Sequence, residues 1–406
     1  MRSAVVDDSR RVVERLVAAR ALATLGRAVI SATAMWELYA RTSSTLVLGS
    51  LGLVQVIPVI ALFVPAGRLV DRVDRRLLTT AASACAGTIG IGLAMSSALD
   101  APVPVYLVLL LAQGGVTSVN SPASATLIPL IVPRDQLIRT NRLNSSLSEL
   151  SWIVGPAVAG LALKWIAPGW IYAAVAVFAC ASALLYRSLP APRAIDDRAA
   201  GNREDWRVGL RYIFGSKLLL PALTLDMFAV LFAGTTALLP AIALDVLHTD
   251  SLGFGILRAA QSAGAVAMAL LGGRIPPWRH PGRVLLIVVA LFGAATIGVG
   301  LSRSLPLTVV VLFACGVLDN ISVVIRLTLE QMVVPDAIRG RVSAVHFVFI
   351  GMSNELGAAE SGLAARLVGI APAVVIGGAI AMIVVGFVAV RWPELARMPP
   401  LAELEP

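Results

Sequence analysis

Three ionisable side chains lie within one long apolar stretch of the sequence, residues 305–333. They are Asp319, Arg326 and Glu330, at spacings of seven and four residues. In a helix these spacings place all three on one face, where Arg326 and Glu330 are close enough to form an ion pair. A charged group among apolar residues is costly unless it faces a polar cavity or a partner. This helix face is therefore the first candidate for chemistry.

A second polar stripe lies in the apolar stretch 103–131. Its members recur at spacings of four, three and four residues and are Gln113, Thr117, Asn120 and Ser124. A shift of 202 residues superimposes this stripe on Cys315, Asp319, Ser322 and Arg326. We interpret the neutral and the charged stripe as two walls of one hydrophilic cavity. The alternative is that these groups hold packed helices together by hydrogen bonds.

Carboxylates inside apolar stretches are candidates for proton binding, because such a group can take up and release a proton during a functional cycle. Asp319 is the first candidate, since the rise of 1.5 Å per residue places it near the middle of its helix. Glu355 and Asp226 follow, and for each a structural ion pair is an equal alternative. Arg27 joins the cavity candidates, and Arg258 requires a carboxylate partner.

Two further polar positions have open or structural interpretations. Glu37 precedes Arg41 by four residues, so the two form either an interfacial ion pair or part of the cavity. His346 is interpreted as a packing residue rather than a proton carrier.

The composition explains what must position these side chains. The 406 residues are 58% hydrophobic and only 14% charged, with a mean hydropathy of +0.85, whereas soluble domains are about 25% charged. A helix that crosses a membrane needs about 20 apolar residues. Such stretches occur at 17–40, 46–66, 77–99, 103–131, 140–163, 169–187, 218–247, 252–275, 283–302, 305–333, 341–366 and 371–391. We therefore predict an all-α polytopic membrane protein with twelve transmembrane helices.

The twelve stretches divide into two halves around the longest connection. We expect a six-helix bundle over 1–187, a cytoplasmic linker over 188–217, and a second six-helix bundle with a short tail over 218–406. The 202-residue shift also superimposes Gly114 and Gly155 on Gly316 and Gly357. An even number of spans in each half gives the two bundles the same orientation, an architecture that places substrate sites between the halves in some transporters.

The net charge of +9 follows the same topology rather than indicating nucleic-acid binding. Nearly all arginines fall in the N-terminal segment, the tail and every second connection, whereas Arg41, Lys164 and Arg303 fall on the other side. Because positive charge accumulates on the cytoplasmic side, both termini are predicted to be cytoplasmic.

Two short motifs have a specific spacing. The connection after the second span contains Gly67, Asp71, Arg72, Arg75 and Arg76. In it, Gly67 would allow close backbone approach and Asp71 would accept hydrogen bonds from a helix N-terminus. The fifth span contains Gly155, Pro156 and Gly160, where the proline removes a helix hydrogen bond and the glycines permit tight packing.

Placed between spans two and three of twelve, the first motif resembles the signature loop of the major facilitator superfamily. That resemblance implies that the five residues act as a conformational latch, with Asp74 standing where most members have glycine. The motif in span five is similar to the Gly-Pro motif of proton-coupled antiporters in the same superfamily. The segments 318–326, 335–345 and 353–357 resemble its enterobactin-exporter-like and multidrug efflux branch, although Ala358 and Ala359 replace an acidic and an aromatic residue that are frequent there.

The resemblance implies a proton-coupled exporter of a small amphipathic molecule, such as a siderophore or an antibiotic, in the bacterial inner membrane. An uptake symporter for a small solute and a membrane receptor without transport remain alternatives. No catalytic, nucleotide-binding or metal-binding motif occurs in the sequence. We therefore expect neither an enzyme nor a bound cofactor or metal. The expected partners are a small-molecule substrate and the lipid bilayer, without nucleic acid, and the chain is expected to be a monomer.

Overall fold

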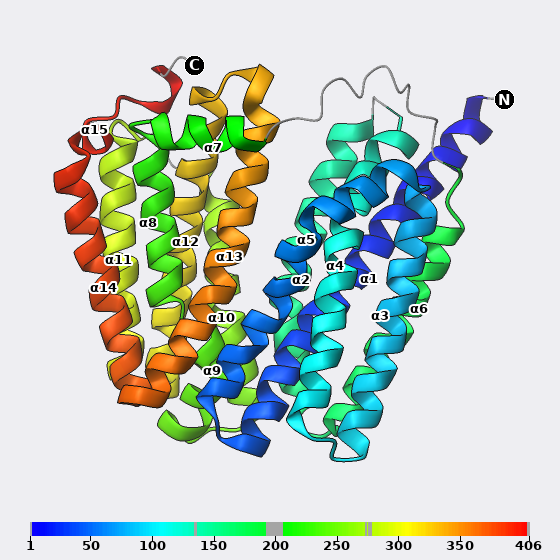
Figure 1. Ribbon diagram of the computed structural model, residues 1–406, viewed down its shortest axis with the longest axis horizontal. Helices are drawn as coiled ribbons and strands as arrows, with labels where there is room; N and C mark the ends of the chain where they lie inside the picture. Colours follow the sequence, from blue (N-terminus) through cyan, green and yellow to red (C-terminus); the bar gives the residue numbers. More distant parts are fainter. Residues whose placement is uncertain (1, 134–135, 192–205, 273, 275–277, 404–406) are drawn as a thin grey trace. The chain divides into compact units, whose positions relative to one another are not determined.

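The computed structural model describes residues 2–133, 136–191, 206–272, 274 and 278–403, and the regular elements within these ranges are all helical (Figure 1). The first six are α1 (Arg2–Thr42), α2 (Thr45–Arg72), α3 (Arg75–Ala98), α4 (Val103–Ile131), α5 (Leu137–Ala162) and α6 (Pro168–Arg187). The others are α7 (Trp206–Gly215), α8 (Leu219–Ala233), η3 (Thr236–Leu238), α9 (Leu239–Ala241), η4 (Ile242–Val246), α10 (Ser251–Gly272), α11 (Pro281–Leu301), α12 (Leu305–Val333), α13 (Asp336–Val368), α14 (Ile370–Arg391), α15 (Pro393–Ala396) and η5 (Leu401–Glu403).

The predicted spans are confirmed as helices. Ten spans within the described residues are long and apolar enough to cross a membrane, and one of them runs from Leu219 through Val246. The two predicted spans outside these ten are α5 and α13, which carry charged and amide side chains along much of their length. Together they make up the twelve-helix fold of a polytopic membrane protein.

Contacts divide the chain into two compact units. The first comprises residues 1–41 and 53–201, and the second comprises residues 42–52 and 202–406. In the first unit α3 packs against α6 and α4, and in the second α10 packs against α12 while α11 packs against α14 and α12. The predicted linker 188–217 lies partly outside the described residues, and its last part contains α7, which runs across the ends of neighbouring helices in the second unit (Figure 1).

The sequence repeat has a structural counterpart at close helix crossings. A Cβ atom on Gly114 of α4 would lie 2.7 Å from the carbonyl oxygen of Gln55 on α2. A Cβ atom on Gly316 of α12 would overlap the carbonyl group of Gln261 on α10. The two superimposed glycines therefore perform the same task in their own units, which is to let a neighbouring helix backbone approach.

The second glycine pair of the repeat behaves in the same way. A Cβ atom on Gly155 of α5 would lie 2.6 Å from the Cβ of Ala28 on α1. A Cβ atom on Gly357 of α13 would lie 2.8 Å from the carbonyl oxygen of Val230 on α8. Any larger side chain at either glycine would separate these helices.

The predicted span 218–247 is interrupted, which the sequence pattern did not indicate. Helix α8 ends at Ala233, and the chain resumes after Gly234 and Thr235 with short 3₁₀, α and π turns. An interruption within an apolar environment exposes carbonyl groups that need hydrogen-bond donors.

Side chains from three other helices supply those donors. Thr296 donates to the Ala233 carbonyl at 3.3 Å, and Ser361 donates to the Gly234 carbonyl at 3.4 Å. Arg258 Nη1 lies 3.5 Å from the carbonyl oxygen of Thr236. The polar residues of α10, α11 and α13 at this depth therefore stabilise the broken helix.

Residues 42–52 pack tightly on α13 within the second unit. A Cβ atom on Gly52 would lie 2.8 Å from the Cβ of Ala358, and one on Gly49 would lie 3.2 Å from the Cα of Ala359. A larger side chain at position 358 would not fit against Gly52. This close crossing requires a small residue at position 358, where the chain has alanine.

Candidate functional site

The central charged group of the second unit is an ion pair between two helices. Arg326 on α12 contacts the carboxylate of Asp226 on α8, and the two side chains are only 3% and 9% exposed. The pairing that we expected within α12, between Arg326 and Glu330, is replaced by this contact between residues 100 positions apart. The alternative interpretation of Asp226, a structural ion pair, therefore describes its observed environment.

Glu330 has different partners, both on α13. Its carboxylate accepts a hydrogen bond from Ser343 and lies 2.5 Å from Nδ1 of His346. His346 is buried, as expected for a packing residue, but its contact with Glu330 was not anticipated. A local sequence window offers no signal for this pair, because the two residues stand 16 positions apart on different helices.

Asp319 differs from the other two proton candidates. It lies on α12, partly buried, and has neither an ion pair nor a hydrogen bond among the described residues. Asp226 is paired with Arg326, and Glu355 lies within electrostatic reach of Arg258. Asp319 is thus the candidate whose proton can leave or arrive without breaking a contact within the protein.

Arg258 and Glu355 form a looser charged pair. Glu355 on α13 and Arg258 on α10 influence each other electrostatically, and Arg258 also reaches the broken helix. Glu355 lies beside the start of α2, since a Cβ atom on Gly52 would lie 3.0 Å from its Oε2 atom. The expectation that Arg258 needs a nearby carboxylate fits this arrangement.

The first unit contains a cavity that the polar stripe of α4 lines. Gln113, Thr117 and Asn120 face it together with Arg27 of α1, and its empty volume is about 410 Å³ including space open to solvent. Four of the predicted cavity residues therefore meet at one place. Ser124, the fourth member of the stripe, lies outside the lining and donates to the carbonyl of Ser121 at 3.1 Å. Ser322, from the second unit, is buried.

Glu37 is the centre of a hydrogen-bonded cluster in the first unit. Its Oε1 atom accepts from Ser97 at 2.7 Å and from Tyr106 at 3.0 Å. Tyr172 donates to Oε2 at 2.9 Å, and Arg41 pairs with Oε1 at 2.7 Å. These contacts join α1, α3, α4 and α6. Glu37 is only 3% exposed, so the cluster lies inside the unit. The ion pair with Arg41 agrees with the interfacial alternative. Glu37 is more deeply buried than that alternative implies.

We expect Glu37→Gln to lower the stability of the protein by about 2–4 kcal/mol, because the neutral amide leaves Arg41 and two tyrosine hydroxyls with weaker partners. Thermal unfolding in detergent measures this as a lowered midpoint temperature. Glu403→Gln, at an exposed position near the end of the described residues, is the control and should unfold close to wild type. Equal midpoints for Glu37→Gln and the control would contradict the structural role of the cluster.

The chain matches known proteins over most of its length. The family model described as Major Facilitator Superfamily matches residues 16–358. The chain belongs to the major facilitator superfamily. It is 28% identical over 315 residues to the enterobactin exporter EntS of Citrobacter koseri. These aligned residues cover 77% of this chain and 75% of that protein. It is also 26% identical over 366 residues to macrolide efflux protein A of Streptococcus pyogenes, covering 87% of this chain and 89% of that protein.

Solved structures share the fold. A bacterial homolog of the human lysosomal transporter Spinster, in an inward-facing and unoccupied conformation, matches with a TM-score of 0.73 at 14% identity over 96% of each chain. A mutant of the nucleoside transporter NupG matches with a TM-score of 0.71 at 12% identity over 93% of this chain and 99% of that one. The superfamily match and the membrane-spanning helices together make this chain a multi-pass membrane transporter.

The superfamily signature motif has a definite local structure here. Gly67, Asp71 and Arg72 lie in the last turns of α2, and α3 begins at Arg75. Asp74 caps α3 by accepting a hydrogen bond from the backbone N–H of Arg76 at 2.8 Å. We had expected Asp71 to serve a helix N-terminus. Asp74 fills this role for α3, because it stands directly before the first turn, and the expectation for Asp71 stays a prediction.

Two other residues of this motif can be placed. Arg76 Nη1 donates to the Leu189 carbonyl at 2.9 Å, which ties α3 to the end of α6. A Cβ atom on Gly67 would meet no described atom within 4 Å, so the close approach that we expected there is not observed. The side chain of Asp71 lies outside the described residues. The latch itself stays a prediction.

The Gly-Pro element lies in α5. Pro156 lies inside this helix, Gly155 forms the α1 crossing described above, and Gly160 is buried.

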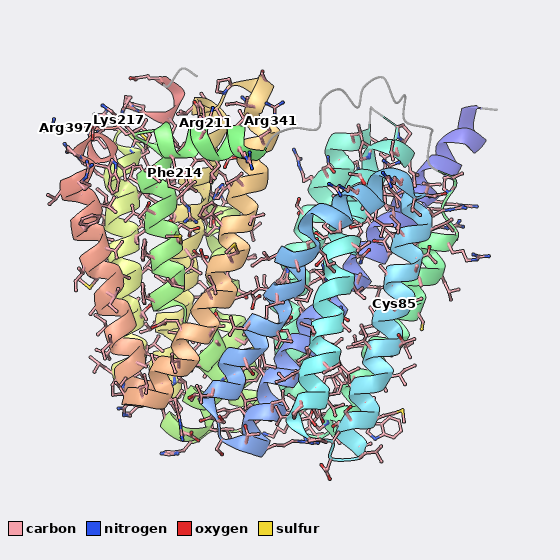
Figure 2. The ribbon with its side chains drawn as sticks, viewed as in Figure 1. Cys85, Arg211, Phe214, Lys217, Arg341 and Arg397 are labelled. Carbon is pink, nitrogen blue, oxygen red and sulfur yellow. The ribbon has the colours of Figure 1, made fainter. Side chains whose placement is uncertain are left out.

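Basic side chains lie at one end of the second unit. Arg211, Lys217, Arg341 and Arg397 lie at the end that α7 covers, together with Phe214, which is 60% exposed (Figure 2). Several basic side chains therefore gather at one end of this unit.

Proposed function

We propose that this superfamily member is a proton-coupled exporter of a small amphipathic molecule in a bacterial inner membrane. The observation that carries the proposal is Asp319, a carboxylate on a membrane-spanning helix without an ion pair or hydrogen bond in the described part of the chain. On the same helix, Arg326 forms an ion pair with Asp226, and Glu330 accepts a hydrogen bond from Ser343. A carboxylate in this setting is suited to bind a proton in one state and release it in another.

Further observations support export and orientation. Curated relatives that cover about three quarters or more of this chain are named as exporters of enterobactin and of macrolides. The basic end of the second unit, formed by α7 and its neighbours, fits the cytoplasmic side, because positive charge is enriched there. In the proposed cycle the two halves expose the substrate alternately to each side, and residues 67–76 stabilise one closed state. A monomer without a cofactor suffices for this cycle.

The direction of transport is tested in whole cells. Cells that express the chain and cells with an empty vector are loaded with a panel of siderophores, macrolides and organic acids, and the retained amount of each compound is measured over time. Export predicts lower retention of at least one compound in expressing cells, and a protonophore should remove the difference. Higher retention in expressing cells would instead establish uptake. No difference for any compound while the protein is present in the membrane would favour the receptor alternative.

A further inference from the structure

Arg27 is a partly buried cation of the first unit that has no matching anion among the described residues. Its guanidinium hydrogen bond is to Thr24 Oγ1 at 3.4 Å, and its Nε atom is buried without a hydrogen-bond partner. No described carboxylate forms an ion pair with it. A charged group with a buried donor that has no acceptor is costly, so an anion bound beside it would stabilise this arrangement.

The surroundings of Arg27 do not supply negative charge. Glu37, ten residues further along α1, is saturated by its contacts with Arg41, Ser97 and the two tyrosines. Arg20 and the hydroxyl of Tyr186 are the ionisable groups that act electrostatically on Arg27. Arg20 adds a second positive charge, and a phenol is neutral at physiological pH. The cavity beside Arg27 therefore has a positive potential.

Two buried amides in the same cavity each have an oxygen atom without a hydrogen-bond partner among the described residues. Gln113 is 5% exposed and Asn120 is 8% exposed, and both face the cavity from α4. These oxygen atoms are Gln113 Oε1 and Asn120 Oδ1, and both are buried. An amide group can both donate and accept, so each needs a polar partner. With Arg27 Nε, these oxygens make three polar atoms that have no hydrogen-bond partner among the described residues.

The remainder of the cavity wall is mostly apolar. It includes Leu22, Ile30, Val116 and Val175. Apolar walls with a few convergent polar groups are typical of sites that recognise organic molecules. A guanidinium binds a carboxylate with two parallel hydrogen bonds, which gives both strength and orientation.

We propose that this cavity binds the acidic group of an amphipathic organic anion, with Arg27 as its charge partner and Gln113 and Asn120 bonded to the adjacent polar atoms. The inference rests on the proposed transport function and names the substrate class as carboxylate-bearing organic anions. Basic macrolides and cationic dyes are then poor substrates, because they bring a positive charge to Arg27.

Three probes of one shape test this proposal: 4-phenylbutyrate, its neutral amide and the corresponding 4-phenylbutylamine. Their affinities for the purified full chain in nanodiscs are measured by isothermal titration calorimetry. The expected result is that the carboxylate binds about tenfold or more tightly than the amide, and that the amine binds least. Equal affinities, a preference for the amine, or no measurable binding of the carboxylate would overturn the proposal. This comparison requires no substitution.

Variants then locate the binding site. Arg27→Gln should lower the affinity for the carboxylate about tenfold and leave that for the amide nearly unchanged, whereas Arg27→Lys should retain part of the preference. Arg303→Gln, at an exposed position away from the cavity, is the matched control and should bind like wild type. An unchanged carboxylate affinity in Arg27→Gln would overturn the assignment to this cavity.

Binding at equilibrium separates this inference from the proposed function. Carboxylate binding without transport would contradict export and leave the anion site standing. Export of cations without carboxylate binding would support export and remove the anion site.

Discussion

Asp319→Asn is expected to abolish proton-driven export while the protein remains folded. Asparagine has nearly the same shape as aspartate but cannot carry the proton. Because Asp319 has no ion pair or hydrogen bond in the described part of the chain, its neutralisation breaks no contact. We expect the export rate, driven by a pH gradient in membrane vesicles, to fall by at least about tenfold relative to wild type.

Three further variants make this result specific. Asp319→Glu keeps a carboxyl group and should retain part of the transport. Asp100→Asn, at a side chain that is 90% exposed, is the matched control and should transport like wild type. If Asp319→Asn exports at the wild-type rate under a pH gradient, Asp319 is not the coupling group. Glu355→Gln is then the next variant, since Glu355 has the looser of the remaining charged contacts.

Asp226→Ala is expected to destabilise the second unit by about 3–5 kcal/mol, because it leaves the Arg326 guanidinium buried without its anion. Thermal unfolding of the purified protein should show a clearly lowered midpoint and a reduced yield of folded protein. This effect on stability distinguishes Asp226 from Asp319, for which we expect mainly a loss of coupling.

The paired substitution provides the control for this prediction. Removal of both charges in Asp226→Ala/Arg326→Met should restore much of the stability lost in Asp226→Ala, since no unpaired charge remains in the interior. A double variant that is as unstable as the sum of its single variants would show that the two residues act independently and would contradict the pair.

The membrane fold could be predicted because hydropathy and length determine which helices cross a bilayer. The repeat could also be predicted, since Gly114 and Gly316 stand at equivalent helix crossings in their units. The break after Ala233 could not, because its carbonyls are satisfied by Thr296 and Ser361, which come from distant parts of the chain. The amino acids around the break do not indicate which distant side chains will donate to it.

The helical period predicts which side chains share a helix face, but it does not predict their partners on other helices. The helical period placed Gln113, Thr117 and Asn120 on one face, and they line one cavity. The period also suggested that Arg326 pairs within its own helix, but the contact with Asp226 on α8 replaces that pairing. A partner on another helix depends on how the helices pack, which spacing along one helix cannot show.

Proton movement in inverted membrane vesicles tests the central claim most directly. Vesicles that contain the wild-type protein and have an acidified lumen receive a compound that expressing cells export, while a pH-sensitive dye reports the lumenal pH. Proton-coupled export predicts that the lumenal pH rises as the compound enters, in proportion to the amount added. Entry of the radiolabelled compound without any change of lumenal pH, or with further acidification, would contradict the claim.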